Sequence, residues 1–500
     1  MDFFAGAEPT ISDILSANVK RTSYYNQVLQ VVLSNRLTLI TGIPGCGKST
    51  LLMQLAFSNE IDGRKFWFNS IIKQEAEKLV RLVKEDDNIT VFLDNLYSNV
   101  DAFEILRDCK NIKLVLAERA LNYEYIKRFL SISSRQIVDI SNLSLNDVQN
   151  ICISMNKSSS DAITLMEKNE NISLLEIVFF VSTSTQIQER IEQYIDDLAR
   201  FSDEDLKIDL LELYTLVNYT SSCGIPITMD MLYFYFTDSI ENYEDILYAL
   251  KKMNKIIVET TDEDLKYDSA QDYLIMRSKL FAEKSINLVP SKMLAQILDN
   301  VLERVSPHII YRYDIFKRKA YDADFTRRAF SKAKGISFYE KLLQQNKSPY
   351  IRHQYAIFLQ RKGNIDLAWE QIDRAYTECQ KKIFSIANTH AIMMFEKNMA
   401  VDAKDKKELQ MQKNTINRSF ATLEYCMTQD IRVNYHALTY ARNAVRYYEK
   451  FGKDEEAQNY IESAIKQLEI ILESKEYIYR VTQREMKSLL QNLKEIKRDF

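Results

Sequence analysis

Residues 42–49 read Gly-Ile-Pro-Gly-Cys-Gly-Lys-Ser, which fits the pattern of a glycine, four residues, another glycine, a lysine and a serine. The chain has only nine glycines, and Gly42, Gly45 and Gly47 fall within six residues. Glycine is concentrated where a backbone must approach a ligand closely. The stretch therefore predicts a phosphate-binding loop (P-loop) whose backbone N–H groups wrap the phosphates of a nucleotide.

The flanking sequence supplies the setting that such a loop needs. Residues 36–41 form a short apolar run typical of a buried strand, and residues 50–57 continue as a helix. This helix adds its positive N-terminal end to the loop. Lys48 is expected to contact the β- and γ-phosphates. The predicted nucleotide-binding residues are Gly42, Pro44, Gly45, Cys46, Gly47, Lys48, Ser49 and Thr50.

Further apolar runs predict more strands of the same sheet. Helical stretches separate these runs, which lie at residues 65–69, 89–94, 111–117 and 136–140. Alternating strands and helices indicate a parallel sheet with helices on both faces. Asp94 ends one of the runs, and a carboxylate at that place holds magnesium through water. Ser49 and Asp94 are therefore the predicted magnesium site.

Charged residues at a strand end complete the predicted chemistry. Glu118 and Arg119 end the run that follows Asp94, and such an end faces the nucleotide cleft of an open α/β sheet. We predict that Arg119 senses the γ-phosphate and that Glu118 helps to orient water; the alternative is a surface salt-bridging pair. Asn95 stands where hydrolysing P-loop enzymes often have a second acid, which predicts slow turnover. The predicted catalytic residues are Lys48, Asp94, Glu118 and Arg119, in a slow ATPase.

The patterns beyond residue 200 predict two further parts. Three short helices and a hairpin make up a winged helix, with helices near 204–217, 228–237 and 242–254 and strands at 256–260 and 265–268. Farther on, helix pairs straddle Gly363 and Gly452, as in irregular tetratricopeptide (TPR) arrays, with one elongated pair between them.

The predicted fold class is an α/β P-loop NTPase domain with a parallel sheet, followed by mostly α-helical parts. The predicted segments are a lead-in at 1–35, the P-loop NTPase core at 36–140, a helical lid at 141–200, the winged helix at 201–285, a helical connector at 286–345 and TPR-like repeats at 346–500.

Composition excludes several classes of protein. The formal net charge of −4 shows no basic bias of the nucleic-acid-binding kind. No apolar run reaches the roughly 20 residues that span a bilayer, and the N-terminus has no signal-peptide pattern. The six cysteines form no paired-thiol motif, which fits a cytoplasmic chain without a membrane partner.

The order of these parts resembles the STAND NTPases, signal-transducing ATPases with numerous domains. Phe4 to Ile14 resembles the lead-in of certain bacterial antiviral members, and Val115 to Arg119 resembles their sensor strand. Residues 267–274 are similar to a segment of the NACHT group, with Tyr267 where that group usually has an ADP-contacting histidine. The lid normally carries a glycine–x–proline near the adenine, and the nearest candidate, residues 171–173, lacks both.

The resemblance implies a switch that holds ADP when closed and ATP when open, with magnesium. It implies a protein or peptide ligand on the repeats, ligand-induced homo-oligomers and an effector, plausible in antiphage defence. An effector domain precedes the lead-in in those relatives. For this sequence three alternatives stay open: the effector is a separate protein, the chain acts without one, or the sequence is an incomplete product.

Three other functions stay open at the level of sequence. One is a DNA-remodelling ATPase of the AAA+ kind, and another is a STAND-type transcription regulator. The third is a nucleotide-stabilised scaffold whose repeats bind a peptide. Lys251 and Lys252 lie on the helix near 242–254, but base readout needs more than a few lysines, so a nucleic-acid partner is not favoured. ATP is favoured over GTP because no guanine-reading Asn-Lys-x-Asp pattern is present.

Overall fold

The structure is a computed structural model, and it describes residues 11–15, 19–69, 71–84, 87–130, 132–169, 172–253, 256–260, 271–276, 279–430, 433–474, 478 and 480–500. The chain divides into two compact units, residues 1–320 and 321–500. This division falls inside the predicted connector. Four predicted features lie wholly or partly outside the described residues: the lead-in motif from Phe4, the residues 171–173, the strand at 265–268 and the segment 267–274.

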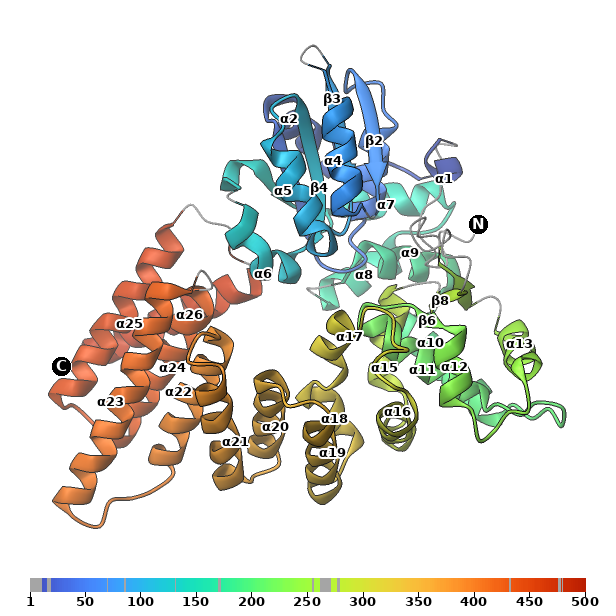
Figure 1. Cartoon of the computed structure of the whole chain (residues 1–500). Coiled ribbons are helices and arrows are strands. Elements are labelled where there is room, and N and C mark those ends of the chain that lie inside the picture. The colour runs from blue at the N-terminus through green and yellow to red at the C-terminus, as the bar shows by residue number, and fades with distance from the viewer. Residues whose placement is uncertain are drawn as a thin grey trace. The chain divides into compact units, whose positions relative to one another are not determined.

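The first unit contains a five-stranded parallel sheet in the order β2-β3-β4-β1-β5 (Figure 1). Each strand lies within two residues of its predicted position, so the predicted parallel sheet is confirmed. Every residue of β1 and β3 is buried, as expected for central strands of a covered sheet. The strands are β1 (Leu37–Gly42), β2 (Arg64–Phe68), β3 (Ile89–Leu93), β4 (Ile112–Arg119) and β5 (Ile137–Asp139).

Helices cover both faces of this sheet. On one face lie α2 (Tyr24–Ser34), which follows the short α1 (Ile11–Leu15), and α3 (Lys48–Ala56); their apolar side chains share a core with Phe92 and Val115. The chain reverses direction across the sheet after β2. Because β-α-β crossovers are right-handed, the later helices lie on the opposite face. These are α4 (Lys73–Leu82), α5 (Val100–Asp108) and α6 (Ala120–Leu130).

Four helices follow the sheet, in the segment predicted as a helical lid. They are α7 (Leu145–Ser154), α8 (Ser160–Lys168), α9 (Leu174–Thr183) and α10 (Ile187–Arg200). Ser144 and Ser173 cap α7 and α9, and in each case an acid three residues later completes a capping box. These boxes fix where each helix begins.

The next segment, predicted as a winged helix, contains α11 (Leu210–Ser222), α12 (Met229–Tyr235) and α13 (Tyr243–Lys252). The predicted start of the first helix near residue 204 is wrong, because the Asp209 side chain accepts the N–H groups of Leu211 and Glu212 and caps α11 there. Three strands form an antiparallel sheet in the order β6-β8-β7. They are β6 (Ile227–Thr228), β7 (Ile257–Glu259) and β8 (Tyr273–Met276). The predicted strand at 265–268 lies outside the described residues.

Helix α11 is the centre of this part of the first unit. Almost all of its residues are buried, and it packs against α10, α15 (Lys279–Leu288), α16 (Ser291–Arg304) and α17 (Tyr313–Ala320). The Tyr214 hydroxyl of α11 hydrogen-bonds the Ser285 hydroxyl of α15 at 2.7 Å. Helix α15 is thereby attached to α11 along one side.

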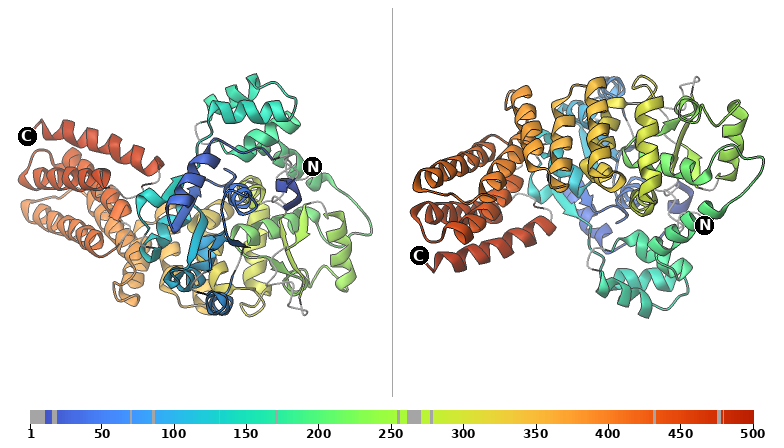
Figure 2. Two further views of the ribbon diagram at one scale, coloured as in Figure 1. Left: turned by 90° about the horizontal axis from the view of Figure 1, so that it is seen from above. Right: turned by 90° about the horizontal axis from the view of Figure 1, so that it is seen from below.

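The second unit is a row of helices in which consecutive members pack against each other (Figures 1 and 2). The predicted pairs around Gly363 and Gly452 are present, and the predicted elongated pair between them is α22 with α23. The helices are α18 (Ala323–Ala329), α19 (Lys332–Gln345), α20 (Pro349–Arg361), α21 (Ile365–Glu378), α22 (Phe384–Met399), α23 (Lys406–Gln429), α24 (Val433–Phe451), α25 (Glu455–Glu473) and α26 (Arg480–Lys497).

Gly335 allows α19 to pack closely against α20. A Cβ built on Gly335 would lie 2.1 Å from Cζ of the buried Phe358. Alanine normally favours a helix by about 1 kcal/mol over glycine, but overpacking of a core costs about 1–3 kcal/mol. We therefore expect Gly335→Ala to lower the free energy of unfolding of the second unit by up to about 2 kcal/mol, which is the overpacking cost less the gain in helix propensity.

The chain has two tryptophans, Trp67 in the first unit and Trp369 in the second. Urea unfolding of a Trp67→Phe background, followed by Trp369 fluorescence, would therefore report on the second unit. Phe358→Leu is the matched partner, because it opens space beside the new methyl group. An additive loss in Gly335→Ala/Phe358→Leu would contradict the packing argument, whereas a smaller loss than the sum would support it.

Candidate functional site

The phosphate-binding loop connects β1 to α3. Gly45 and Gly47 have φ angles of +75° and +92°, a region that residues with a side chain rarely adopt. Gly47 is also the N-cap of α3, so the helix begins directly after it. Ser49 and Thr50 lie in the first turn of α3, and together with Pro44 they are half-buried. The loop therefore has the backbone form that a phosphate cradle at a helix N-terminus requires.

Lys48 lies over the loop. Its Nζ donates to the carbonyl oxygens of Ile43 at 2.8 Å and Gly42 at 3.2 Å, and lies 3.6 Å from Cys46 Sγ. Burial raises the pKa of the Cys46 thiol, although Lys48 acts against this rise. A Cβ on Gly42 would lie 2.6 Å from Cys46 Sγ. Cys46 thus fills the space beside Gly42, and a larger residue at position 42 would have to displace that side chain.

Asp94 and Arg119 lie near the loop at the carboxyl edge of the sheet. In the strand register, Gly42 is opposite Arg119, and Leu93 is opposite Leu116. Strand β4 lies between β1 and β3, and neighbouring strands are about 4.8 Å apart. Arg119 therefore stands beside the first residue of the loop, and Asp94 stands one strand farther away.

An asparagine-rich turn fixes the backbone around Asp94. Asp94 is 6% exposed, and its Oδ1 accepts the N–H of Asn95 at 2.9 Å. Asn95 has a φ of 50°, which asparagine tolerates better than most residues. The Nδ2 of the buried Asn99 donates to the carbonyl oxygens of Asp94 and Asn95, each at 3.1 Å. Asn99, which sequence reasoning did not single out, thereby holds the turn that presents Asp94.

Glu118 is buried, and backbone N–H groups around it donate hydrogen bonds to its carboxylate. Its Oε1 accepts the N–H of Arg119 at 2.6 Å and Nδ2 of Asn122 at 2.9 Å, and its Oε2 accepts the N–H of Tyr97. Burial raises the pKa of Glu118, these hydrogen bonds act against the rise, and the nearby Asp94 adds to it. The contacts fix the end of β4 against the turn after β3. The predicted role in orienting water stays a prediction.

Two helices that are distant in sequence cover the loop. The N–H of Leu175, at the start of α9, donates to the carbonyl oxygen of Gly45 at 2.9 Å. A Cβ on Gly45 would lie 3.0 Å from both Ser173 Oγ and the Leu280 side chain of α15. Leu174 lies similarly close to Gly47. The start of α9 and one face of α15 therefore contact the glycines that would wrap the phosphates.

Ion pairs connect α15 to both sides of the same site. Arg119 Nη1 pairs with Oε1 of Glu283, a residue 164 positions later in the chain. Lys284 Nζ pairs with Oε1 of Glu176 at 2.7 Å. Burial on its own raises the pKa of Glu176, but bonds from Lys284 and Ser173 outweigh it and lower the pKa. Sequence reasoning singled out only Arg119 among these residues.

A single carboxylate joins the lead-in helix to the first helix of the lid segment. Asp147 accepts the N–H and Oγ of Ser23 at 2.6 and 2.7 Å, and the N–H and Oγ of Ser144 at 3.3 and 2.6 Å. Ser23 is the N-cap of α2 and Ser144 the N-cap of α7. The base of the lid segment is therefore connected to the helix that precedes β1.

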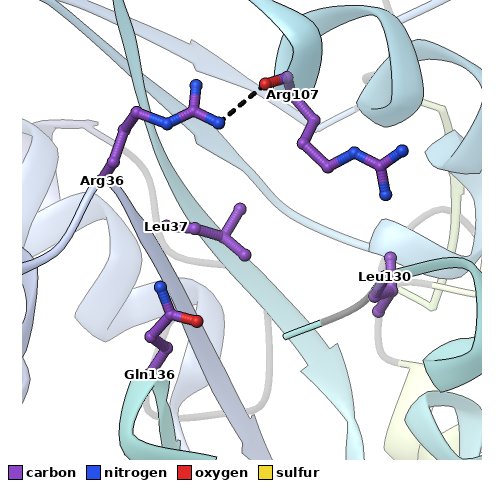
Figure 3. A pocket seen from close by; sticks show the side chains of 5 residues that line it. All are labelled: Arg36, Leu37, Arg107, Leu130 and Gln136. Carbon is purple, nitrogen blue, oxygen red and sulfur yellow. Dashed lines mark hydrogen bonds between the residues drawn. The ribbon is translucent and has the colours of Figure 1, made fainter. Parts of the chain in front are cut away.

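A separate cavity of about 320 Å³ lies at the other end of the sheet (Figure 3). Arg36 directly precedes β1, and its guanidinium donates to the carbonyl oxygens of Arg107 and Cys109, each at 2.8 Å. The guanidinium is thus used to join strand β1 to the end of α5. The cavity is lined by Arg36, Leu37, Arg107, Leu130 and Gln136, and none of them belongs to the predicted nucleotide site.

The arrangement around the loop fits a nucleoside triphosphate. Positive-φ glycines and a helix N-terminus are suited to phosphate oxygens, and Lys48 supplies a cation at the loop. Ser49 and Asp94 are oxygen donors of the kind that magnesium prefers beside phosphates. Arg119 adds a second cation on the neighbouring strand. The residues present can therefore bind, orient and neutralise a chain of phosphates.

Comparisons with known proteins agree with this reading of the first unit. Residues 1–130 match the model of the family described as Novel STAND NTPase 5. A search of curated proteins found no match.

A solved structure of a STAND protein with a tetratricopeptide repeat sensor from Pyrococcus horikoshii is similar at 14% identity. The similarity covers 95% of this chain and 80% of that one, with a TM-score of 0.30. A TM-score at this level does not establish a common three-dimensional arrangement.

Among the described residues, none of the helices has both the length and the apolar character that crossing a bilayer requires.

Proposed function

We propose that this chain, whose residues 1–130 match the STAND NTPase family, is a nucleotide-dependent signalling switch that binds ATP or ADP at residues 42–49. The observation that carries the proposal is that later helices contact the loop. The N–H of Leu175 bonds Gly45, and Leu280 lies against the same glycine. A ligand on the loop that favours or disfavours these contacts must shift the position of α9 and α15.

Each site residue has a role in this proposal. Lys48 moves from the loop carbonyl groups to the β- and γ-phosphates, and the N–H groups from Gly45 to Thr50 surround the phosphates. Ser49 and Asp94 hold magnesium, which neutralises phosphate charge. Arg119 contacts the γ-phosphate. Glu118 orients the end of β4 and the nearby water, and with Asn95 in place of a second acid the ATPase is slow.

The remaining parts of the proposal come from the family resemblance. The helical repeats bind a protein or peptide ligand, and the opened chains form homo-oligomers that activate a separate effector. We place this switch in the cytoplasm and in defence against phage. Co-purification of partners from infected cells, compared with uninfected cells, would test this part independently of nucleotide binding.

The first experiment identifies the nucleotide that the protein carries. The full chain is purified, denatured and centrifuged, and the supernatant is chromatographed, with Lys48→Ala as the control. We expect a stoichiometric amount of ADP in the wild type and none in the variant, because a covered site releases its ligand slowly.

An empty site with rapid turnover that DNA stimulates would contradict the switch. It would favour a remodelling ATPase of the AAA+ kind. Bound ADP without ligand-dependent turnover or assembly would favour a nucleotide-stabilised scaffold. A shift of genomic DNA fragments in a gel would favour a transcription regulator.

A further inference from the structure

The Arg119–Glu283 ion pair joins the nucleotide site to a helix far along the chain. Arg119 is the last residue of β4, and Glu283 lies in the middle of α15. Their side chains are 28% and 31% exposed, so the pair is partly withdrawn from water. Charges in such positions interact more strongly than fully exposed charges.

From the position of Arg119, its guanidinium can reach two different partners. Its Cα is the register partner of Gly42, the first loop residue, at about 4.8 Å. An arginine side chain is long and flexible, so its guanidinium can reach the phosphate region as well as α15. Carboxylates and phosphates bind the same guanidinium face. Glu283 and a terminal phosphate are therefore competitors for one cation.

Glu283 belongs to a helix that contacts the site at three successive points. Leu280 lies against Gly45, Glu283 pairs with Arg119, and Lys284 pairs with Glu176 at the start of α9. On another side, Ser285 hydrogen-bonds Tyr214 of α11. Loss of the central contact would therefore weaken the hold of α15 on the nucleotide site while its attachment to α11 persists.

Given the proposed contact of Arg119 with the γ-phosphate, we propose that Glu283 is the alternative partner of the same guanidinium. With a diphosphate in the site, Arg119 stays paired with Glu283 and holds α15 against the loop. With a triphosphate, the guanidinium binds the terminal phosphate, and α15 loses its central contact. This inference rests on the proposed function, since it requires nucleotide at residues 42–49.

Thermodynamic linkage gives the proposal a measurable consequence. If the Glu283 pair disfavours triphosphate binding by some factor, triphosphate disfavours the pair by the same factor. Glu283→Gln keeps the shape of the side chain and removes its charge. We expect this variant of the full chain to bind β,γ-imido-ATP about tenfold more tightly than the wild type does. Its affinity for ADP should change less than about twofold, because ADP does not draw on Arg119.

Two variants make this measurement specific. Lys284→Met removes the neighbouring ion pair of the same helix, and it should change the ratio of the two affinities much less than Glu283→Gln does. In an Arg119→Ala background, Glu283→Gln should produce no change in that ratio. Equal tightening for both nucleotides, or a shift that persists without Arg119, would overturn the proposal.

Hydrogen exchange of residues 279–288 supplies a second readout. We expect faster exchange in the wild type with β,γ-imido-ATP than with ADP, and fast exchange in Glu283→Gln with either. Wild-type protein that binds neither nucleotide would overturn the proposed function together with this inference. Wild-type protein that binds both, with Glu283→Gln leaving their affinity ratio and the exchange unchanged, would overturn this inference alone.

Discussion

Replacing Lys48 with alanine is expected to weaken the binding of ATP by about 30-fold or more. Lys48 Nζ now rests 2.8 Å from the Ile43 carbonyl oxygen, within the loop that would hold the phosphates. Removing one member of a hydrogen-bonded charge pair in a partly buried site costs about 2–5 kcal/mol, and each 1.4 kcal/mol is tenfold in affinity. Titration of nucleotide-free full-length protein by calorimetry would measure the change.

Two controls separate the loss of a phosphate contact from other causes. Lys73→Ala removes an exposed lysine at the start of α4 and should leave the affinity unchanged. Thermal unfolding of Lys48→Ala without nucleotide should stay near that of the wild type, because the only side-chain bonds lost are those to two backbone carbonyl groups and a thiol of the loop. A Lys48→Ala protein that is folded and keeps its ATP affinity would show that residues 42–49 do not bind the phosphates.

The sequence alone predicts the loop and its sheet because the information is local. A buried run, closely spaced glycines and a largely apolar helix follow one another within about 20 residues, and each pattern has a physical reason of its own. The same reasoning predicts that Asp94 and Arg119 lie at the ends of strands. Parallel strands bring their carboxyl ends to one edge, so the order of strands places these residues near Gly42.

The contacts that cover the loop could not be predicted in the same way. Glu283 and Arg119 are 164 residues apart, and the sequence around each residue contains no pattern that predicts their pairing. A local signal does exist at the start of α9, where Ser173 and Glu176 form a capping box. That signal predicts where the helix begins. It does not predict that the Leu175 N–H meets Gly45, because this depends on how the helices pack.

The start of a helix elsewhere in the chain shows the same difference between what local sequence signals predict and what packing decides. The first helix after residue 200 begins at Leu210 because Asp209 caps it, although apolar residues from 204 onward continue the helical pattern. Asp205 and Asp209 are both plausible caps by residue type. The choice between them is made by packing, since α11 is nearly all buried whereas 203–207 are mostly exposed. Local propensity is a weak guide when burial decides.

Replacing Asp147 with alanine is expected to lower the free energy of unfolding of the first unit by about 3–5 kcal/mol. The change removes the side-chain acceptor of two bonds from Ser23 and two from Ser144. Asp147 itself is 3% exposed, whereas Ser144 is half-buried and Ser23 is exposed, so the loss comes mainly from the removed bonds of the buried carboxylate. Urea unfolding followed by Trp67 fluorescence in a Trp369→Phe background would report on this unit.

Asp161 offers a matched control, since it also lies in the first turn of a lid-segment helix but is exposed. Asp161→Ala should change the free energy of unfolding by about 0.5 kcal/mol or less. A loss as large as that of Asp147→Ala would show that helix-terminal charge, rather than the double cap, accounts for the effect. Asp147→Asn should lose about as much stability as Asp147→Ala does. The N–H groups of the asparagine amide would face the donors of Ser23 and Ser144 and could not accept hydrogen bonds from them.

The pH dependence of the stability difference between wild type and Asp147→Asn tests whether the negative charge of the carboxylate accounts for the stabilisation. Burial on its own raises the pKa of Asp147, but hydrogen bonds from Ser144 and Ser23 outweigh it and lower the pKa. A lowered folded-state pKa gives stabilisation that is complete above the unfolded value of about 3.9 and is lost as the pH falls through the folded value. The difference between wild type and Asp147→Asn should therefore be constant from about pH 7 to pH 5 and shrink below about pH 4. A difference that persists unchanged to lower pH would mean that shape, and not charge, joins α2 to α7.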